Sequence, residues 1–192
     1  GKYAFCSGGD QKVRGYAGYV GGDGHARLNV LELQRIIRTM PKPVIAAVHG
    51  YAVGQGCELA GTCDMTIAAD DAVMGEIQIR HGFGPPILIT PFLTGLKQAK
   101  ELLLLGERIN AQEALRLGLV NKEVPTKELM ATAEDWAKKI AALPLKAVRQ
   151  NKLLVNRVYE IAGFREALDY RADATLAERL GTRAAEPDPH LK

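Results

Sequence analysis

The feature that most restricts the fold of this chain is the segment AVGQGCE at residues 52–58. A short apolar run is interrupted by two glycines that flank a glutamine, and a cysteine and a glutamate follow directly. Glycine has no Cβ, so it accepts positive φ and allows another group to approach the main chain closely. The segment therefore predicts a tight turn between a buried strand and a helix. The turn either only connects the two elements or directs N–H groups toward a ligand.

Short apolar runs alternate with helical patterns along the chain, which favours an α/β fold with parallel strands. Strands are expected at 3–6, 44–48, 65–69, from 73 onward and at 120–124. Helices are expected from Asn29 to Met40, over 56–63, over 110–118, from Thr126 through Ile140, from Pro144 to about Tyr159 and over 164–180. Two of these helices begin with the spacing of a capping box, Asn29 with Glu32 and Asn110 with Glu113. Residues 15–26 and 81–91 are expected to be loops.

The composition is that of a globular protein, and it does not indicate a nucleic-acid or membrane partner. Of 192 residues, 47% are hydrophobic and 24% charged, and 25 basic residues against 22 acidic ones give a net charge of +3. The basic residues are interspersed, whereas nucleic-acid binding calls for a basic stripe. No apolar run is long enough to span a bilayer, and the three cysteines form no CxxC pair. We therefore expect a cytoplasmic protein with reduced thiols.

A second glycine turn follows the same pattern as the first. Ser7-Gly8-Gly9-Asp10 follows one expected strand, and Gly54-Gln55-Gly56 follows another and opens a helix. The first N–H groups of a helix lack partners within the helix and carry partial positive charge. Two such turns that converge could bind a carbonyl oxygen that becomes an oxyanion. Plain turns are the alternative, and neither turn matches GxGxxG or a P-loop.

Three longer motifs resemble the crotonase superfamily, the enoyl-CoA hydratase/isomerase fold. They are AFCSGGD (4–10), PKPVIAAVHGYAVGQGCELAGTCDMTIAADDAVMG (41–75) and ERINAQEALRLGLVNKEVP (107–125). The resemblance implies an α/β fold, the crotonase (ClpP/crotonase-like) spiral of strand–helix units with a C-terminal helical region. It divides the chain into a core at 1–125, expected to lack N-terminal strands of the family, and a helical trimerisation region at 126–192, expected to lack the last helix. A homotrimer or homohexamer would follow.

The resemblance also implies a substrate and a set of site residues. The substrate would be an acyl-CoA thioester, as in fatty acid metabolism, with no cofactor and no metal ion. The oxyanion hole would consist of the main-chain N–H groups of Gly9 and Gln55, and Glu58 would be the catalytic carboxylate. An acid in a first helical turn also stabilises the helix dipole, which is the alternative role for Glu58. The other residues placed against substrate are Ser7, Gly8, Asp10, Gln11, Lys12, Tyr19, Gly54 and Gly56. The alternatives are that Asp10 accepts backbone N–H bonds within its turn and that Lys12 is a solvated surface residue.

Position 78 departs from the hydratase pattern of this family. A second glutamate belongs near this position, and the chain has Gln78 instead. Glutamine has the shape of glutamate but cannot exchange a proton at neutral pH, although it can orient a water molecule. Glu76 is near in sequence, but in an extended segment its side chain would lie about 7 Å from that of residue 78. Gln78 is therefore expected to belong to the catalytic site without acting as an acid.

Three functions are compatible with these residues. The segment from Gly56 onward resembles hydratases and favours the addition of water to an enoyl-CoA. The segment SGGDQKVRG (7–15) with Tyr19 resembles dihydroxynaphthoyl-CoA synthase and related hydrolases, so ring closure or hydrolysis of a β-oxo acyl-CoA is an alternative. A non-catalytic acyl-CoA-binding or scaffold protein is the third, because Gln78 removes one carboxylate.

Overall fold

The computed structural model describes residues 3–9, 30–82, 84–85 and 88–167, and within them the strands form two three-stranded sheets. One sheet has the order β1-β3-β6, and the other has the order β2-β4-β5. All strand pairs are parallel except β4 with β5. The predicted α/β class with parallel pairing is therefore confirmed. The strands are β1 (Ile45–Val48), β2 (Tyr51–Val53), β3 (Met65–Ala69), β4 (Val73–Gly75), β5 (Ile109–Asn110) and β6 (Lys122–Val124).

The chain crosses twice from the first sheet to the second. β1 leads through residues 49–50 into β2, and β3 leads through residues 70–72 into β4. β1 pairs with β3, and β2 pairs with β4. The second crossing therefore repeats the first, displaced by one strand in each sheet. Gly50 makes the first crossing possible, since its φ is +55° and a Cβ there would lie 2.7 Å from the Tyr3 carbonyl oxygen. Repeated passes of this kind build the spiral that the sequence predicts.

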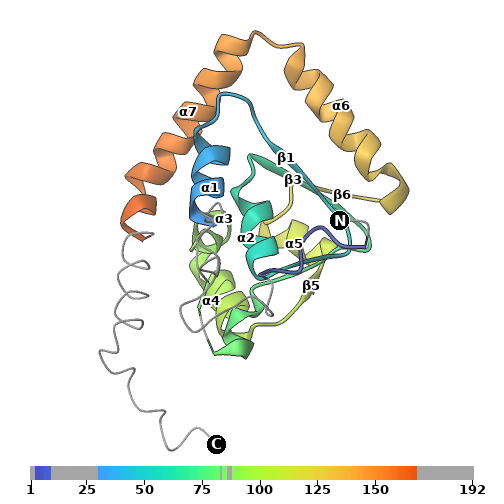
Figure 1. Cartoon of the computed structure of the whole chain (residues 1–192), viewed down its shortest axis with the longest axis vertical. Helices are drawn as coiled ribbons and strands as arrows, with labels where there is room; N and C mark the ends of the chain where they lie inside the picture. Colours follow the sequence, from blue (N-terminus) through green and yellow to red (C-terminus); the bar gives the residue numbers. More distant parts are fainter. Residues whose placement is uncertain (1–2, 10–29, 83, 86–87, 168–192) are drawn as a thin grey trace, which may run out of the picture.

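Helix α2 (Gln55–Thr62) lies at the centre of the molecule, with the other elements around it (Figure 1). Its buried face carries small side chains such as Cys57 and Ala60, which pack among Ala46, Val48 and Ala68 of the strands. Small side chains allow the helix backbone to approach the sheet closely. In the described residues no helix is both long enough and apolar enough to cross a bilayer. The other helices are α1 (Val30–Thr39), α3 (Thr90–Leu93), α4 (Leu96–Leu105), α5 (Ala111–Leu117), α6 (Leu129–Ala141) and α7 (Leu145–Ile161), with 3₁₀ turns η1 (Ile77–His81) and η2 (Thr126–Glu128).

Sequence signals at helix ends gave mixed results. At α5 the prediction is confirmed, because Asn110 Oδ1 accepts a hydrogen bond from the Glu113 N–H at 2.8 Å and Gly118 ends the helix with φ +85°. At α6 the prediction is wrong, because Thr126 opens η2 and the helix begins three residues later. The Thr126 N–H and hydroxyl both donate to Asp70 Oδ1 instead, which fastens η2 to the end of β3.

Other expected elements differ or lie outside the described residues. The strand expected at 3–6 is reduced to a single bridge between Cys6 and Ala52. No element was expected at 94–106, where the structure has α4, ended by Gly106 with φ +60°. The capping residue Asn29, the loop at 15–26 and most of the helix expected at 164–180 fall outside the described residues.

Helices α6 and α7 run along opposite sides of the molecule and meet at residues 142–144 (Figure 1). Helix α6 packs on β1 and β3, and its Leu129, Ala133 and Trp136 contact Ile67 and Val124. Six large apolar side chains of α7 are exposed on the surface of the single chain. They are Leu145, Leu153, Leu154, Val155, Val158 and Ile161.

A single buried lysine fastens α7 to the core. Lys152 Nζ donates to Asp64 Oδ2 at 2.8 Å, to the Ile37 carbonyl at 2.8 Å and to the Lys42 carbonyl at 3.1 Å. Asp64 Oδ2 also accepts from the Val44 N–H at 2.7 Å, so the carboxylate orders the turn before β3 as well. Three segments distant in sequence are therefore joined through one ammonium group.

Replacing Lys152 by methionine is expected to lower the free energy of unfolding by about 3 kcal/mol, because Asp64 would stay largely buried without its cation. Urea unfolding followed through the single tryptophan, Trp136, measures this. Lys138→Met is the matched control, since Lys138 is exposed and its ion pair among the described residues is with Glu134 at 3.7 Å, and it should cost less than about 1 kcal/mol. Equal losses in the two variants would contradict the anchoring role of Lys152.

Candidate active site

The two glycine turns lie against each other at the N-terminal end of α2. The segment before the first turn runs beside β2, where the Phe5 N–H donates to the His49 carbonyl at 2.9 Å and the Cys6 N–H donates to the Tyr51 carbonyl at 3.0 Å. The Val53 N–H returns a bond to the Cys6 carbonyl at 3.1 Å. These bonds align residues 5–6 with β2, so the two glycine turns that follow these segments begin side by side.

Glycine is needed where the two turns touch. A Cβ at Gly56 would overlap the Cys6 carbonyl oxygen. A Cβ at Gly8, whose φ is +93°, would lie 3.2 Å from the Val53 carbonyl oxygen, with the Gln55 nitrogen next to it at 3.8 Å. Gln55 is the first residue of α2, so its N–H has no acceptor within the helix. The positive φ of the second turn falls on Gly54 at +58°, and Gln55 is therefore free of backbone strain.

Glu58 is fully buried in the first turn of α2, with 0% of its surface exposed. Its N–H donates to the Gly54 carbonyl at 3.1 Å, and its Oε1 accepts from Gln78 Nε2 at 3.0 Å. An acid that only stabilised the helix dipole could remain in water, whereas burial of a carboxylate carries a large desolvation cost. The structure thus brings together Glu58 and Gln78, as the sequence analysis expects of two site residues.

Glu76 is a further member of this cluster, because the condition that would have set it about 7 Å from residue 78, an extended segment, is not met. The segment after β4 is the 3₁₀ turn η1 and is not extended, so the side chains of Glu76 and Gln78 meet. Gln78 Nε2 donates to Glu76 Oε2 at 3.0 Å, and the Thr90 hydroxyl donates to Glu76 Oε1 at 2.7 Å. Glu76, Gln78 and Thr90 are all less than 5% exposed. The sequence signal was an acid two residues before the position where a carboxylate was missing.

Burial dominates the electrostatics of this cluster. Desolvation raises the pKa of Glu76 to about 7, against the opposing effect of the hydrogen bonds from Thr90 and Gln78. The neighbouring thiol of Cys57 is also buried, and desolvation, reinforced by the charge of Glu76, raises its pKa well above the usual range. In the described part of the chain no ion pair involves Glu76. Glu76 therefore titrates close to neutral pH.

The amide of Gln78 is oriented by its acidic neighbours. Only its –NH₂ end can face two carboxylates, because an amide oxygen placed there would meet other acceptors. Its Oε1 has no hydrogen-bond partner among the described residues, although it is buried. A Cβ at Gly54 would lie 3.8 Å from Gln78 Cδ, so the amide lies against the glycine turn. Gln78 Oε1 is therefore available to a hydrogen-bond donor beside the candidate oxyanion hole.

A family profile described as enoyl-CoA hydratase/isomerase matches residues 1–182. The chain belongs to this family. Among solved structures it is similar to an enoyl-CoA hydratase/isomerase from Xanthobacter autotrophicus Py2, with 38% identity and a TM-score of 0.75 over 77% of this chain and 55% of that one. It is also similar to an enoyl-CoA hydratase from Mycobacterium avium, with 32% identity and a TM-score of 0.70 over 74% of this chain and 65% of that one.

An enoyl-CoA hydratase from Mycobacterium smegmatis is 31% identical, with a TM-score of 0.72 over 95% of this chain and 71% of that one. The crotonase fold that the motifs imply is thereby confirmed. The chain spans about 55% of the Xanthobacter structure and 65% of the M. avium structure to which it is similar.

The structure describes part of the substrate-binding set expected for an enoyl-CoA hydratase/isomerase. Ser7 is exposed, Gly8 and Gly9 are half-buried, and Gly54 and Gly56 are buried. Among the described residues no three His, Cys, Asp or Glu side chains are grouped to hold a metal ion. Four expected residues lie outside the described part of the chain. They are Asp10, Gln11, Lys12 and Tyr19.

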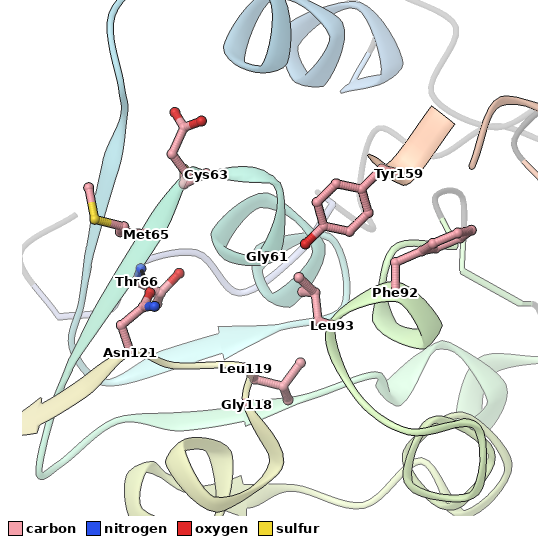
Figure 2. A pocket seen from close by; sticks show the side chains of 11 residues that line it. Gly61, Cys63, Met65, Thr66, Phe92, Leu93, Gly118, Leu119, Asn121 and Tyr159 are labelled. Atoms are coloured by element: carbon pink, nitrogen blue, oxygen red, sulfur yellow. Dashed lines mark hydrogen bonds between the residues drawn. The ribbon is translucent and has the colours of Figure 1, made fainter. Parts of the chain in front are cut away.

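A separate cavity of about 190 Å³ lies at the opposite end of α2. It is lined by Gly61, Asp64, Thr66 and Asn121, and Figure 2 shows the ring of Tyr159 reaching toward it from α7. None of the expected site residues lines this cavity. We therefore place the candidate active site of this family member at the N-terminal end of α2.

Replacing Gly56 by alanine is expected to cost about 3 kcal/mol of unfolding free energy, because the added methyl group overlaps the Cys6 backbone and forces the turns apart. Gly95→Ala is the control, since a Cβ there meets only the flexible end of Gln98. Urea unfolding of both variants measures the difference. Similar stability of the two would show that the turns are not in close contact.

The unfolding free energy should depend on pH through Glu76. Its folded pKa of about 7 lies above the ordinary value of 4.5, so the native state binds more protons than the unfolded chain between these values. Stability from this group is therefore complete below about pH 4.5 and is lost as pH rises through 7, by on the order of 3 kcal/mol.

Comparison of the wild type with Glu76→Gln at pH 5 and pH 8 isolates this contribution, because the other carboxylates cancel. The variant should lose much less stability between the two pH values. A loss equal to that of the wild type would refute the raised pKa.

Proposed function

We propose that this chain is an enoyl-CoA hydratase-type lyase that adds water to the double bond of an acyl-CoA thioester. The observation that carries the proposal is the position of Glu58. This carboxylate is fully buried one helical turn from the Gln55 N–H, and it is hydrogen-bonded to a second buried side chain, Gln78. A buried acid beside main-chain donors suits the transfer of a proton near a thioester carbonyl.

The thioester carbonyl oxygen binds to the main-chain N–H groups of Gly9 and Gln55. When water adds to the β-carbon, negative charge moves onto this oxygen and gives an enolate. The two N–H groups are fixed by the backbone of the touching turns, so they stabilise that charge without rearrangement. Loss of one donor from such a pair typically costs about 3 kcal/mol of transition-state stabilisation.

Glu58 transfers the protons. Its carboxylate accepts a proton from the attacking water as the new C–O bond forms, and it returns a proton to the α-carbon as the enolate collapses. Gln78 has no exchangeable proton at neutral pH, but its Oε1 accepts a hydrogen bond from the water and orients it. The contact between Gln78 and Glu58 places that water beside the base.

The rest of the substrate is held by the glycine turns and by the segment after the first turn. From the resemblance we expect Ser7, Asp10, Gln11 and Tyr19 to help hold the substrate, and Gly8, Gly54 and Gly56 to let it approach the backbone. Lys12 binds the CoA phosphates, which carry the negative charge that a lysine complements. No further cofactor is required, because the thioester itself supplies the electron sink.

We further propose that the helical region at 126–192 assembles the chain into a homotrimer or homohexamer in the cytoplasm. The support is the row of exposed apolar side chains along α7, from Leu145 to Ile161. Apolar patches of this kind on a soluble protein mark interfaces between proteins. In a closed oligomer of identical chains, a second copy of this chain would cover these side chains.

The sequence of residues 7–15 favours one further candidate, the ring closure or hydrolysis carried out by the synthase-like members of the superfamily that this segment resembles. Turnover of crotonyl-CoA against succinylbenzoyl-CoA distinguishes the two chemistries. Binding of both esters without turnover of either would favour a non-catalytic acyl-CoA-binding protein.

The variant Glu58→Gln tests the proposed function directly. We expect it to lower kcat for crotonyl-CoA hydration by about 10³-fold, in the range of general acid–base contributions, and to leave binding of the CoA ester unchanged because the amide keeps the shape of the carboxylate. Steady-state kinetics and calorimetric titration measure the two effects. Glu113→Gln is the control, because Glu113 is a half-buried glutamate of α5 paired with Arg116 and lies outside the candidate site. Unchanged turnover in Glu58→Gln would refute the catalytic role.

A further inference from the structure

We propose that Glu76 is the second carboxyl group of this active site. Glu58 and Glu76 are bridged by the Gln78 amide and act as one unit, and the two carboxyl groups together carry a single proton at neutral pH. The proposal rests on the proposed function but assigns a residue that function does not use. It also accounts for the glutamine at position 78, where the hydratase pattern has an acid.

The geometry of the bridge carries the argument. The two hydrogens of Gln78 Nε2 are donated to Glu58 Oε1 and Glu76 Oε2, each at 3.0 Å. Two acceptors on one –NH₂ group lie about 5 Å apart, because its N–H bonds diverge by about 120°. Two buried carboxylates at this separation cannot both ionise without strong repulsion. The pair therefore retains one proton.

The surroundings of Glu76 favour this charge state. Among the described residues, the polar groups around Glu76 are Cys57 from α2, Gln78 from η1 and Thr90 from α3, and Glu58 lies on the other side of the Gln78 amide. None of these groups is a cation. The Thr90 hydroxyl lies 2.7 Å from Glu76 Oε1 and can donate to the ionised carboxylate or accept from the protonated carboxyl. Glu76 is thus held in place in both protonation states.

The titration behaviour agrees with the geometry. Burial raises the pKa of Glu76 to about 7, so a proton stays on this pair up to near-neutral pH. Residue 78 completes the arrangement, because a glutamate there would bring a third carboxyl group against the other two. A glutamate at 76 therefore favours a glutamine at 78, which adds no third charge.

The pair of Glu58 and Glu76 holds the same number of protons before and after the reaction. Water gives one proton to Glu58 as its oxygen bonds to the β-carbon, the electrons of the C=C bond move to the thioester oxygen, and Glu58 gives one proton to the α-carbon. The unit begins and ends with one proton. Glu76 acts through Glu58 and Gln78 and is a positioning residue. When Glu76 also ionises, the enolate forms beside two anions, so turnover should fall above pH 7.

The test uses crotonyl-CoA hydration from pH 5.5 to 9 with the wild type, Glu76→Gln, Gln78→Glu and the double variant Glu76→Gln/Gln78→Glu. The wild-type kcat/KM should fall above a pKa near 7. Glu76→Gln should abolish this alkaline decline and keep KM within about threefold, because an amide at 76 mimics the neutral acid. Gln78→Glu should lose at least tenfold in kcat/KM, and the double variant should regain most of that loss. An unchanged alkaline decline in Glu76→Gln would overturn the proposal.

A second readout does not depend on activity. In ligand-free protein with ¹³C-labelled glutamate carboxyl groups, the NMR signal that disappears in Glu76→Gln should titrate near pH 7, and titration near 4.5 would overturn the proposal. If Glu76→Gln fails to fold, Thr90→Val replaces it. Loss of the Thr90 hydrogen bond should move the alkaline decline to higher pH, and no movement would overturn the proposal.

The outcomes separate the two proposals. A wild type that hydrates no enoyl-CoA defeats the proposed function, while the NMR titration still decides whether the carboxyl unit exists. A wild type that is active, with a pH profile that Glu76→Gln leaves unaltered, defeats only the carboxyl unit. Glu113→Gln should match the wild type in both measurements.

Discussion

The close contact between the turn at residues 7–9 and the N-terminal end of α2 is the constraint on which the rest of the site depends. It exists because Gly8 and Gly56 have no side chains at the point where the two backbones meet. The contact sets the Gln55 N–H beside the first turn and fixes the direction in which α2 enters the core. Glu58 lies one helical turn further along α2 and is therefore buried, although burial of a carboxylate is unfavourable.

That cost is offset by a polar cluster assembled from three separate elements. α2 supplies Glu58, η1 supplies Gln78 at the end of the second sheet, and α3 supplies Thr90, which contacts Glu76. The hydrogen bonds of a single amide satisfy one oxygen of each carboxylate, so the acids remain buried and ordered. The same desolvation that would destabilise an isolated acid brings the pKa of Glu76 close to neutral, where a proton can be exchanged. Stability and chemistry are therefore set by one physical effect.

The sequence predicted most of the fold because its signals are local. The apolar run at 65–69 became β3 with the same bounds, and Asn110 capped α5 as its spacing indicated. Predictions failed where a tertiary contact decided the outcome. Thr126 has the side chain of a helix cap, but Asp70, distant in sequence, takes both of its hydrogen bonds. Glu76 was set apart from Gln78 on the assumption of an extended strand, and the 3₁₀ turn after β4 brought them together.

Motifs and turn residues were enough to predict the family, the two glycine turns and Glu58 as the acid beside them, because these signals act through the local backbone. Which polar groups share the buried site depends on contacts between distant segments. Glu58, Glu76, Gln78 and Thr90 come from three elements whose meeting depends on the packing of α2 against the second sheet. Their charge state is a property of burial and mutual distance, and neither of these is encoded at any one position of the chain.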